Sequence, residues 1–253
     1  MSLHLIKYVL TAAIRDKLFY AVILLMIIGS SLPLFLGSSA VIEQGRFSLV
    51  FAAGGLRFAG VLVLVLFVVN FVRRSFDSKD VDFLLSRPIS RIQFLFSFAA
   101  AFTVLAVILG LAIGLSLYAL GPELFGEGHL LWAFSIIIEY IIMANAALFV
   151  AMALPSATVA SVVCFAFYVL ARMMGTFLGI VDANYVNYDH GAMNFTIQFV
   201  STVMPRLDLM GQTAWLIYGV EERIGYGFLV LQGLFFTVIV LSAAMIDLLR
   251  REF

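Results

Sequence analysis

Six apolar stretches, each about as long as a bilayer is thick, constrain the fold of this chain more than any other feature. Each carries at most one charged side chain, and together they cover residues 18–36, 49–72, 94–120, 130–153, 159–181 and 227–249. About 20 apolar residues cross a bilayer as a helix. A helix also satisfies its own backbone polar groups, which lipid cannot do. The pattern predicts an all-α integral membrane protein with six transmembrane helices.

Composition supports the same class. Hydrophobic residues make up 64% of the 253 residues and charged residues only 12%, whereas soluble domains average about 45–50% and 25%. A soluble fold of this size has too little interior to hide so many apolar side chains. The net charge is zero, so a nucleic-acid partner is not expected. We interpret residues 1–253 as a single transmembrane domain.

The basic residues predict the orientation. They gather before the first span, between the second and third spans and after the last span, at Lys7, Arg15, Lys17, Arg73, Arg74, Lys79, Arg87, Arg91, Arg250 and Arg251. The positive-inside rule then places both termini in the cytoplasm. Residues 1–17 alternate apolar and basic positions, which favours an interfacial amphipathic helix. The alternative is that they are simply the flank of the first span.

A long loop, residues 182–226, separates the fifth and sixth spans and is predicted to be extracytoplasmic. It contains two apolar runs, 192–204 and 207–218, interrupted by Pro205 and Arg206. Runs of about 10–14 apolar residues are too short to span and are typical of re-entrant segments. We therefore expect a short re-entrant helix pair that dips into the outer leaflet.

The segment 73–91 is the most charged part of the chain, and its centre has the pattern of a short amphipathic helix. Val81, Leu84 and Leu85, with Phe83 beside them, form an apolar face, and charged residues form the other face. Pro88 then ends the helix, because the residue before a proline disfavours helical geometry. Such a helix can dock in the groove of a soluble partner. The alternative is an ordinary positive-inside loop.

This segment resembles the cytoplasmic loop of ABC transporter permeases of the ABC-2 type (type V exporter-like). That loop has an acidic residue followed by two leucines, two further residues, a proline, an aliphatic residue, a small residue and an arginine. Here Asp77 precedes the run Leu84-Leu85-Ser86-Arg87-Pro88-Ile89-Ser90-Arg91. The chain departs from the pattern in having Lys79 where glycine is common, and Asp rather than Glu at position 77. The overall order of spans and loops is also similar.

The resemblance implies a transport function with partner chains. The coupling helix would contact an ABC ATPase subunit, present in two copies, through Asp80, Val81, Asp82, Phe83, Leu84, Leu85, Ser86 and Arg87. ATP and Mg²⁺ would bind to that ATPase, and this chain would hold no cofactor. A second permease subunit would complete the transporter, as a homodimer or with a similar chain. The location implied is the bacterial inner (cytoplasmic) membrane.

The lysines agree that this chain is not itself the ATPase. A phosphate-binding P-loop needs a lysine directly after a glycine. The chain has only Lys7, Lys17 and Lys79, and none of them follows a glycine. The histidines, His4, His129 and His190, are scattered without the spacing of metal ligands, so no metal site is expected.

Three ionisable residues lie inside predicted spans: Arg57, Glu139 and Arg172. Such residues are costly in a bilayer and usually face protein or water. All three fall near the middle or in the outer half of their spans, so one carboxylate could serve one or two guanidiniums. The group is either a polar patch on a substrate path or a buried structural ion pair. Gly110 and Gly114 in the third span predict a close helix contact.

Two other functions stay open at this point. An intramembrane enzyme needs paired catalytic groups at a common depth, and no histidine lies in a span. An ion-coupled secondary transporter would use Glu139 together with an inverted repeat and broken helices. The two halves of the chain show no convincing repeat. The sequence does not identify the transported substrate.

Overall fold

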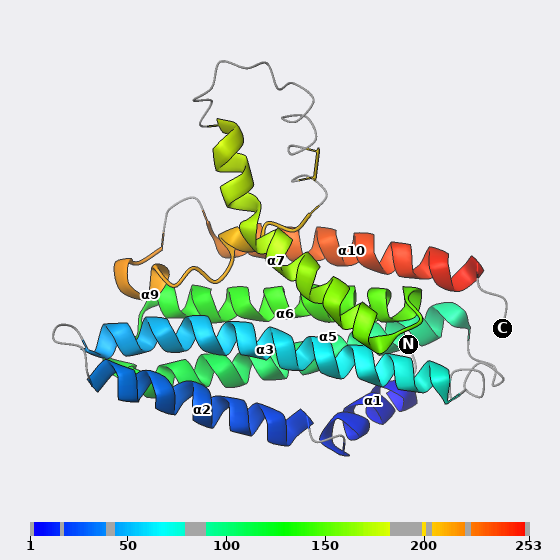
Figure 1. Cartoon of the computed structure of the whole chain (residues 1–253), viewed down its shortest axis with the longest axis horizontal. Coiled ribbons are helices and arrows are strands. Elements are labelled where there is room, and N and C mark those ends of the chain that lie inside the picture. The colour runs from blue at the N-terminus through cyan, green and yellow to red at the C-terminus, as the bar shows by residue number, and fades with distance from the viewer. Residues whose placement is uncertain are drawn as a thin grey trace.

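The computed structural model describes residues 3–15, 18–38, 44–78, 90–182, 199–200, 204–220 and 224–250, and these residues contain helices and turns but no β-strand. The long helices are α1 (Leu3–Arg15), α2 (Leu18–Ser38), α3 (Gln44–Asp77), α5 (Arg91–Leu120), α6 (Glu127–Ala153), α7 (Ala157–Asp182) and α10 (Tyr226–Arg250). Of these, α2, α3, α5, α6 and α10 run nearly parallel in one bundle, whereas α1 and α7 are inclined to it (Figure 1). Three short elements complete the set: η1 (Pro122–Leu124), η2 (Leu207–Leu209) and α9 (Trp215–Tyr218).

The long helices match the predicted spans to within about five residues at each end. Five of them, α3, α5, α6, α7 and α10, are long and apolar enough to cross a membrane. Helices α1 and α2 meet at a bend of 55°, and this pair makes a sixth span if it is counted as one. The all-helical, multi-pass membrane class is confirmed, with five spans clear on their own.

Helix α6 forms the centre of the bundle, with α3, α5, α7 and α10 packed around it. Small residues allow the closest approaches. A Cβ atom added to Gly110 would lie 3.1 Å from the Cα atom of Ile137, and one added to Gly114 would lie 3.1 Å from the Cβ atom of Ala133. The predicted close contact through Gly110 and Gly114 is therefore confirmed, between α5 and α6. Gly233 brings α10 equally close to the other side of α6.

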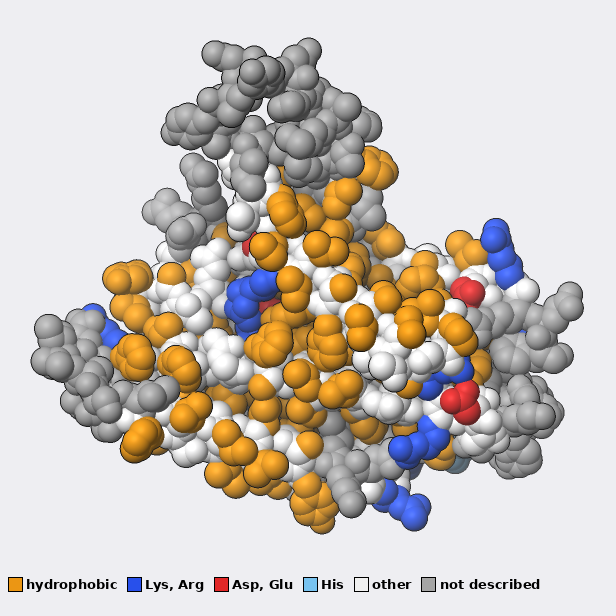
Figure 2. Space-filling model, in the orientation of Figure 1, with side chains coloured by type: hydrophobic (Ala, Val, Ile, Leu, Met, Phe, Trp, Pro, Cys, Tyr) orange, Lys and Arg blue, Asp and Glu red, His pale blue; other side chains and the backbone are white. Residues whose placement is uncertain are grey.

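The outer surface of the bundle is apolar over most of the face shown in Figure 2. Large side chains such as Leu231, Phe235 and Val238 on α10 and Leu115 on α5 are more than half exposed. Water-soluble monomers rarely expose apolar surface on this scale. Lipid removes the cost, because hydrocarbon tails solvate these side chains as well as a protein core would.

Helix α1 is amphipathic, as predicted, and its apolar face packs against protein. Leu5, Val9 and Ala13 are buried at a contact with α5. The ring of Tyr8 lies 5.9 Å from the ring of Phe71 on α3. The placement of residues 1–17 in a membrane interface stays a prediction.

One predicted helix is wrong. The apolar run 207–218 folds as η2, a turn at Gly211 and the four-residue helix α9, rather than as one helix. Gly211 has a φ of +55°, in the left-handed region that glycine adopts without strain. Leu207, Met210, Trp215 and Leu216 are buried, so tertiary packing fixes this irregular backbone. Residues 192–198 and 201–203 of the other predicted re-entrant helix lie outside the described residues.

Candidate functional site

The three charged residues predicted within spans come together at one point in the bundle. Glu139 on α6 is fully buried and lies between two arginines. Its Oε1 atom is 3.6 Å from Nε of Arg57 on α3, and its Oε2 atom is 3.6 Å from Nη1 of Arg172 on α7. One carboxylate therefore serves two guanidiniums and ties three helices together. We call Arg57, Glu139 and Arg172 the charged triad.

Two tyrosines on the spans complete the surroundings of the triad. The hydroxyl of Tyr168 on α7 donates a hydrogen bond of 2.8 Å to Oε1 of Glu139. The hydroxyl of Tyr140, the residue after Glu139, donates a 3.0 Å hydrogen bond to the backbone oxygen of Arg57. Buried polar groups are costly unless they are hydrogen-bonded. These bonds therefore stabilise both the carboxylate and the α3 backbone beside it.

The irregular backbone of residues 207–211 supplies the remaining acceptors. Nη1 of Arg172 donates to the backbone oxygens of Leu207 and Met210, the latter at 2.7 Å. Nη1 of Arg57 donates to the backbone oxygen of Gly211. The backbone oxygen of Leu207 also accepts a 3.1 Å hydrogen bond from the N–H of Met210. The oxygens of Met210 and Gly211 would be occupied by backbone N–H groups in a regular helix. The departure from helix at 207–218 thus provides acceptors for both arginines.

A serine fastens this backbone to the central helix. The backbone N–H of Gly211 donates a 2.9 Å hydrogen bond to Oγ of Ser135 on α6. Gly175 on α7 also packs tightly here, because an added Cβ atom would lie 2.6 Å from Oδ2 of Asp208. Asp208 pairs in turn with Arg206 at 2.8 Å. That hydrogen-bonded pair raises the pKa of Arg206.

Sequence reasoning found the triad but missed Ser135, Tyr140, Tyr168 and the carbonyl groups of 207–211. A signal for two of them exists. Ser135 is four residues before Glu139, and Tyr168 is four residues before Arg172. Residues four apart share a helix face, so polar residues at this spacing in an apolar span indicate one polar face. The carbonyl contacts have no comparable signal, because they join residues remote in sequence.

The predicted ATPase contact, Asp80, Val81, Asp82, Phe83, Leu84, Leu85, Ser86 and Arg87, lies outside the described residues. Both of its flanks are described. Asp77 ends α3 and pairs with Arg73 at 2.7 Å. Ser90 caps the start of α5 by accepting a 3.1 Å hydrogen bond from the backbone N–H of Gln93. Nη1 of Arg91 donates to the backbone oxygen of Leu248 at 3.1 Å, so the start of α5 is held to the end of α10.

Directly behind these flanks lies a cluster of aromatic rings, which we call the aromatic cluster. It comprises Tyr8 of α1, Phe67 and Phe71 of α3, and Phe94, Phe98 and Phe102 of α5. Ring centres of neighbouring members lie between 4.4 Å (Phe94 and Phe98) and 6.5 Å (Phe67 and Phe102) apart. Such ring pairs add to the stability gained from burial. The cluster couples α1, α3 and α5 next to the segment 79–89.

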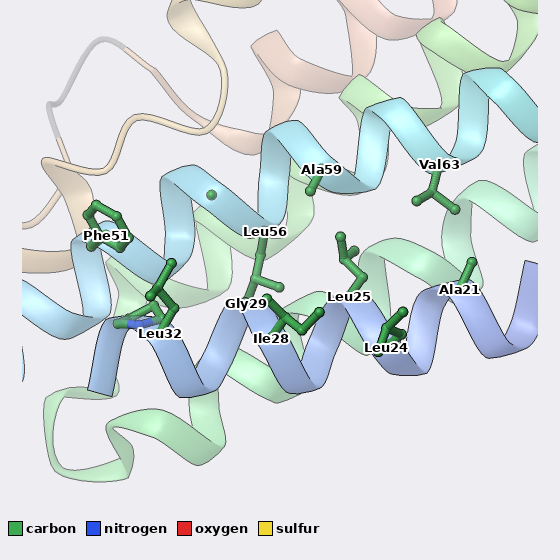
Figure 3. A pocket seen from close by; sticks show the side chains of 12 residues that line it. Ala21, Leu24, Leu25, Ile28, Gly29, Leu32, Phe51, Leu56, Ala59 and Val63 are labelled. Carbon is green, nitrogen blue, oxygen red and sulfur yellow. The ribbon is translucent and has the colours of Figure 1, made fainter. Parts of the chain in front are cut away.

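An apolar groove of about 400 Å³ runs between α2 and α3 (Figure 3). Leu24, Ile28 and Leu32 of α2 and Phe51, Ala59 and Val63 of α3 are among the side chains that line it. At its centre Gly29 packs against Leu56, whose Cδ2 atom would lie 2.4 Å from an added Cβ atom. Recognition of a particular ligand needs a few placed polar groups. This lining has none, so the groove offers shape and apolar surface alone.

Among the described residues, no three His, Cys, Asp or Glu side chains are grouped so that they could hold a metal ion. The triad contributes only one carboxylate, and its other two members are cations. A search against protein-family models and curated proteins finds no match to this chain.

Proposed function

We propose that this chain is the membrane-spanning permease subunit of an ATP-driven exporter. A separate ABC ATPase would bind ATP and Mg²⁺ and drive the movement of the spans. The transporter would contain two ATPase subunits and two permease subunits, most simply two copies of this chain. The basic flanks would face the cytoplasm of a bacterial cell, and residues 182–226 would face the outside.

One observation supports this proposal above the others. The segment that resembles a coupling loop joins two helices, and the described residues next to it are held tightly to the rest of the bundle. Its flanks are the end of α3 and the start of α5. Arg91 is hydrogen-bonded to α10, and the ring of Phe71 packs at an angle against that of Tyr8 of α1. A partner that displaced this segment would therefore move four helices together.

The aromatic cluster explains how such a displacement would be transmitted. Close-packed rings do not compress, because protein interiors are as dense as organic crystals. A push on the segment 79–89 would therefore reach α1 and α5 through Phe71 and Phe98, whose ring centres are 6.0 Å apart. By contrast, a force on a loop without such packing behind it would move only the loop and would not displace the helices.

The proposal is tested by purifying the tagged full chain from its native membranes in a mild detergent. We expect an ATP-hydrolysing chain to co-purify in a fixed ratio, and mass spectrometry identifies it. Leu84→Asp and Leu85→Asp place charges on the predicted docking face, so they should release the ATPase and abolish ATP-dependent transport. Both variants should retain the elution volume and thermal stability of the unmodified chain.

A matched control adds the same charge at the other end of the bundle. Val220 lies in the turn between α9 and α10 and is exposed, so Val220→Asp should leave the ATPase bound. The proposal is wrong if no ATP-hydrolysing chain co-purifies. It is also wrong if the Leu84 and Leu85 variants keep both the ATPase and the transport activity.

An ion-coupled transporter is the second candidate, and the buried carboxylate of Glu139 is the observation that favours it. Carboxylates inside spans act as proton relays in many transporters. Here, however, the carboxylate of Glu139 is held between two guanidiniums, each 3.6 Å away, and is not open to a proton path. Transport that survives ATP depletion but collapses with the proton gradient would support this candidate over the first.

A further inference from the structure

The charged triad is not electrically balanced. Two guanidiniums share one carboxylate, so one positive charge remains at a point deep within the spans. Glu139 lies 12 residues from the start of α6 and Arg172 lies 10 residues from the end of α7, which corresponds to depths of about 18 Å and 15 Å at 1.5 Å per residue. An uncompensated charge is expensive in hydrocarbon. Binding of an anion beside the triad would therefore be favourable.

The side chains of both arginines reach the surface of the bundle, although Nε of Arg57 is itself buried. The side chain of Arg172 is 24% exposed and that of Arg57 is 11% exposed. Of the three nitrogen atoms in the guanidinium group of Arg172, only Nη1 donates hydrogen bonds to described residues. Its Nε and Nη2 atoms have no such partner there and are not fully buried. Two guanidinium groups with free N–H donors match the geometry of a phosphate group.

The surface around these donors is apolar. Figure 2 shows a group of basic side chains near the middle of the face, with many hydrophobic side chains around it. Phe58, next to Arg57, is 50% exposed, and its ring lies 6.2 Å from that of Tyr168. Val169, which is three residues before Arg172 and shares its face of α7, is 46% exposed. A ligand here would place its charged group on the arginines and its apolar part on this surface.

The described spans of a second copy offer no counter-charge. The only acidic side chain that they hold away from their ends is Glu139, which is fully buried between its own arginines. Asp208 also acts on Arg172, but it is paired with Arg206. Two copies whose described spans met at this face would therefore bring like charges together, and the apolar surroundings favour a counter-anion with hydrocarbon chains.

We propose that Arg57 and Arg172 bind the phosphate headgroup of an anionic lipid that enters sideways from the membrane. A resident lipid keeps its headgroup at the membrane surface, so a headgroup at this depth belongs to a lipid in transit. If the bound lipid is also the transported substrate, the substrate class is an anionic phospholipid, and that assignment rests on the proposed permease function. The binding itself does not require the ATPase and is measured without it.

The test uses the full chain in nanodiscs that contain phosphatidic acid and phosphatidylcholine with identical acyl chains. Native mass spectrometry then counts the lipids that each released protein retains. We expect phosphatidic acid to be enriched on the unmodified chain relative to the bilayer. Arg172→Gln should lower that enrichment about tenfold, which corresponds to about 1.4 kcal/mol, because it removes a charge-assisted contact. Arg172→Lys keeps the charge and should retain most of the enrichment.

Arg73→Gln is the matched control, because Arg73 is also partly buried on α3 but pairs with Asp77 at the end of the helix. It should change the enrichment less than twofold. The unmodified chain alone can overturn the proposal, even if a variant fails to fold: equal retention of the two lipids excludes a headgroup site. Displacement of phosphatidic acid by equimolar inorganic phosphate would assign the site to a water-soluble anion instead.

A protein partner is the remaining outcome that would overturn the proposal. In that case the chain would retain no phosphatidic acid, and Arg172→Gln would dissociate a protein complex in the same spectra. The two proposals fail independently, since Leu84→Asp and Leu85→Asp test the ATPase contact and leave the triad unchanged. Enrichment of phosphatidic acid without an ATPase partner would support a lipid-binding protein of another class.

Discussion

Replacing Glu139 by glutamine tests whether the charged triad holds the bundle together. At an effective dielectric constant of about 20, opposite charges 3.6 Å apart attract by about 5 kcal/mol, and Glu139 has two such pairs. Desolvation and the repulsion between Arg57 and Arg172 offset much of this. Removing one partner of a buried ion pair costs about 3–5 kcal/mol, because a charge is left without its counter-charge. We expect Glu139→Gln to lower the free energy of unfolding by that amount.

The assay is unfolding in mixed micelles of dodecyl maltoside and increasing dodecyl sulfate. The buried side chains of Trp132 on α6 and Trp215 on α9 report it by fluorescence. Glu127→Gln changes the same type of residue at the exposed start of α6 and should alter stability by less than about 0.5 kcal/mol. Adding Arg172→Gln to Glu139→Gln should recover part of the loss, because neighbouring charges couple.

If Glu139→Gln lowers the free energy of unfolding by less than about 1 kcal/mol while the variant retains the unmodified fold, the triad does not hold the bundle together. That result would mean that Tyr168 and the carbonyl groups of residues 207–211 satisfy the arginines without the carboxylate. Tyr168→Phe separates these contributions, since it removes only the 2.8 Å hydrogen bond to Glu139. A hydrogen bond to a charged group contributes about 1.5–3 kcal/mol, so the loss should be smaller than for Glu139→Gln.

Two further predictions concern close packing around α6. A Cβ atom added to Gly128 would lie 2.0 Å from the backbone oxygen of Trp215. Gly128→Ala should therefore displace α9 and shift the tryptophan fluorescence to longer wavelength. Unchanged fluorescence would contradict this expectation. Gly110→Ile should cost about 1–3 kcal/mol through overpacking against Ile137, measured by the same unfolding assay. Gly54→Ala is the control for both, because its added methyl group meets no atom within 4 Å and should leave stability unchanged or raise it by up to about 1 kcal/mol.

The helices were predictable because the bilayer leaves few alternatives. A long apolar run such as 94–120 can only be a buried helix or a span, and α5 covers it fully. The meeting of Arg57, Glu139 and Arg172 was predictable for the same reason. Charged side chains inside spans avoid lipid, so a carboxylate and guanidiniums at similar depths are expected to pair. Both inferences follow from the properties of the lipid around the helices and do not require knowledge of how the side chains pack.

The backbone of residues 207–218 could not be predicted in this way. Its apolar letters favour a helix by their pattern. Its conformation is fixed instead by Arg57, Arg172 and Ser135, which lie between 35 and 154 residues away in sequence. Local propensity carries no information about such contacts. The short apolar runs on either side of Pro205 and Arg206 therefore predicted a re-entrant helix pair, but residues 207–218 do not form one helix.

Helix α3 links the charged triad to the aromatic cluster, because it carries Arg57 at the first and Phe71 at the second. Under the permease proposal, a displacement at the segment 79–89 reaches the triad along this single helix. Separating Arg57 from Glu139 would leave a buried charge unpaired, which is the costly outcome. The triad should therefore move as one unit with α3, α6 and α7. A translocated headgroup would then pass along the exposed N–H groups of Arg172, beside the triad and not between its members.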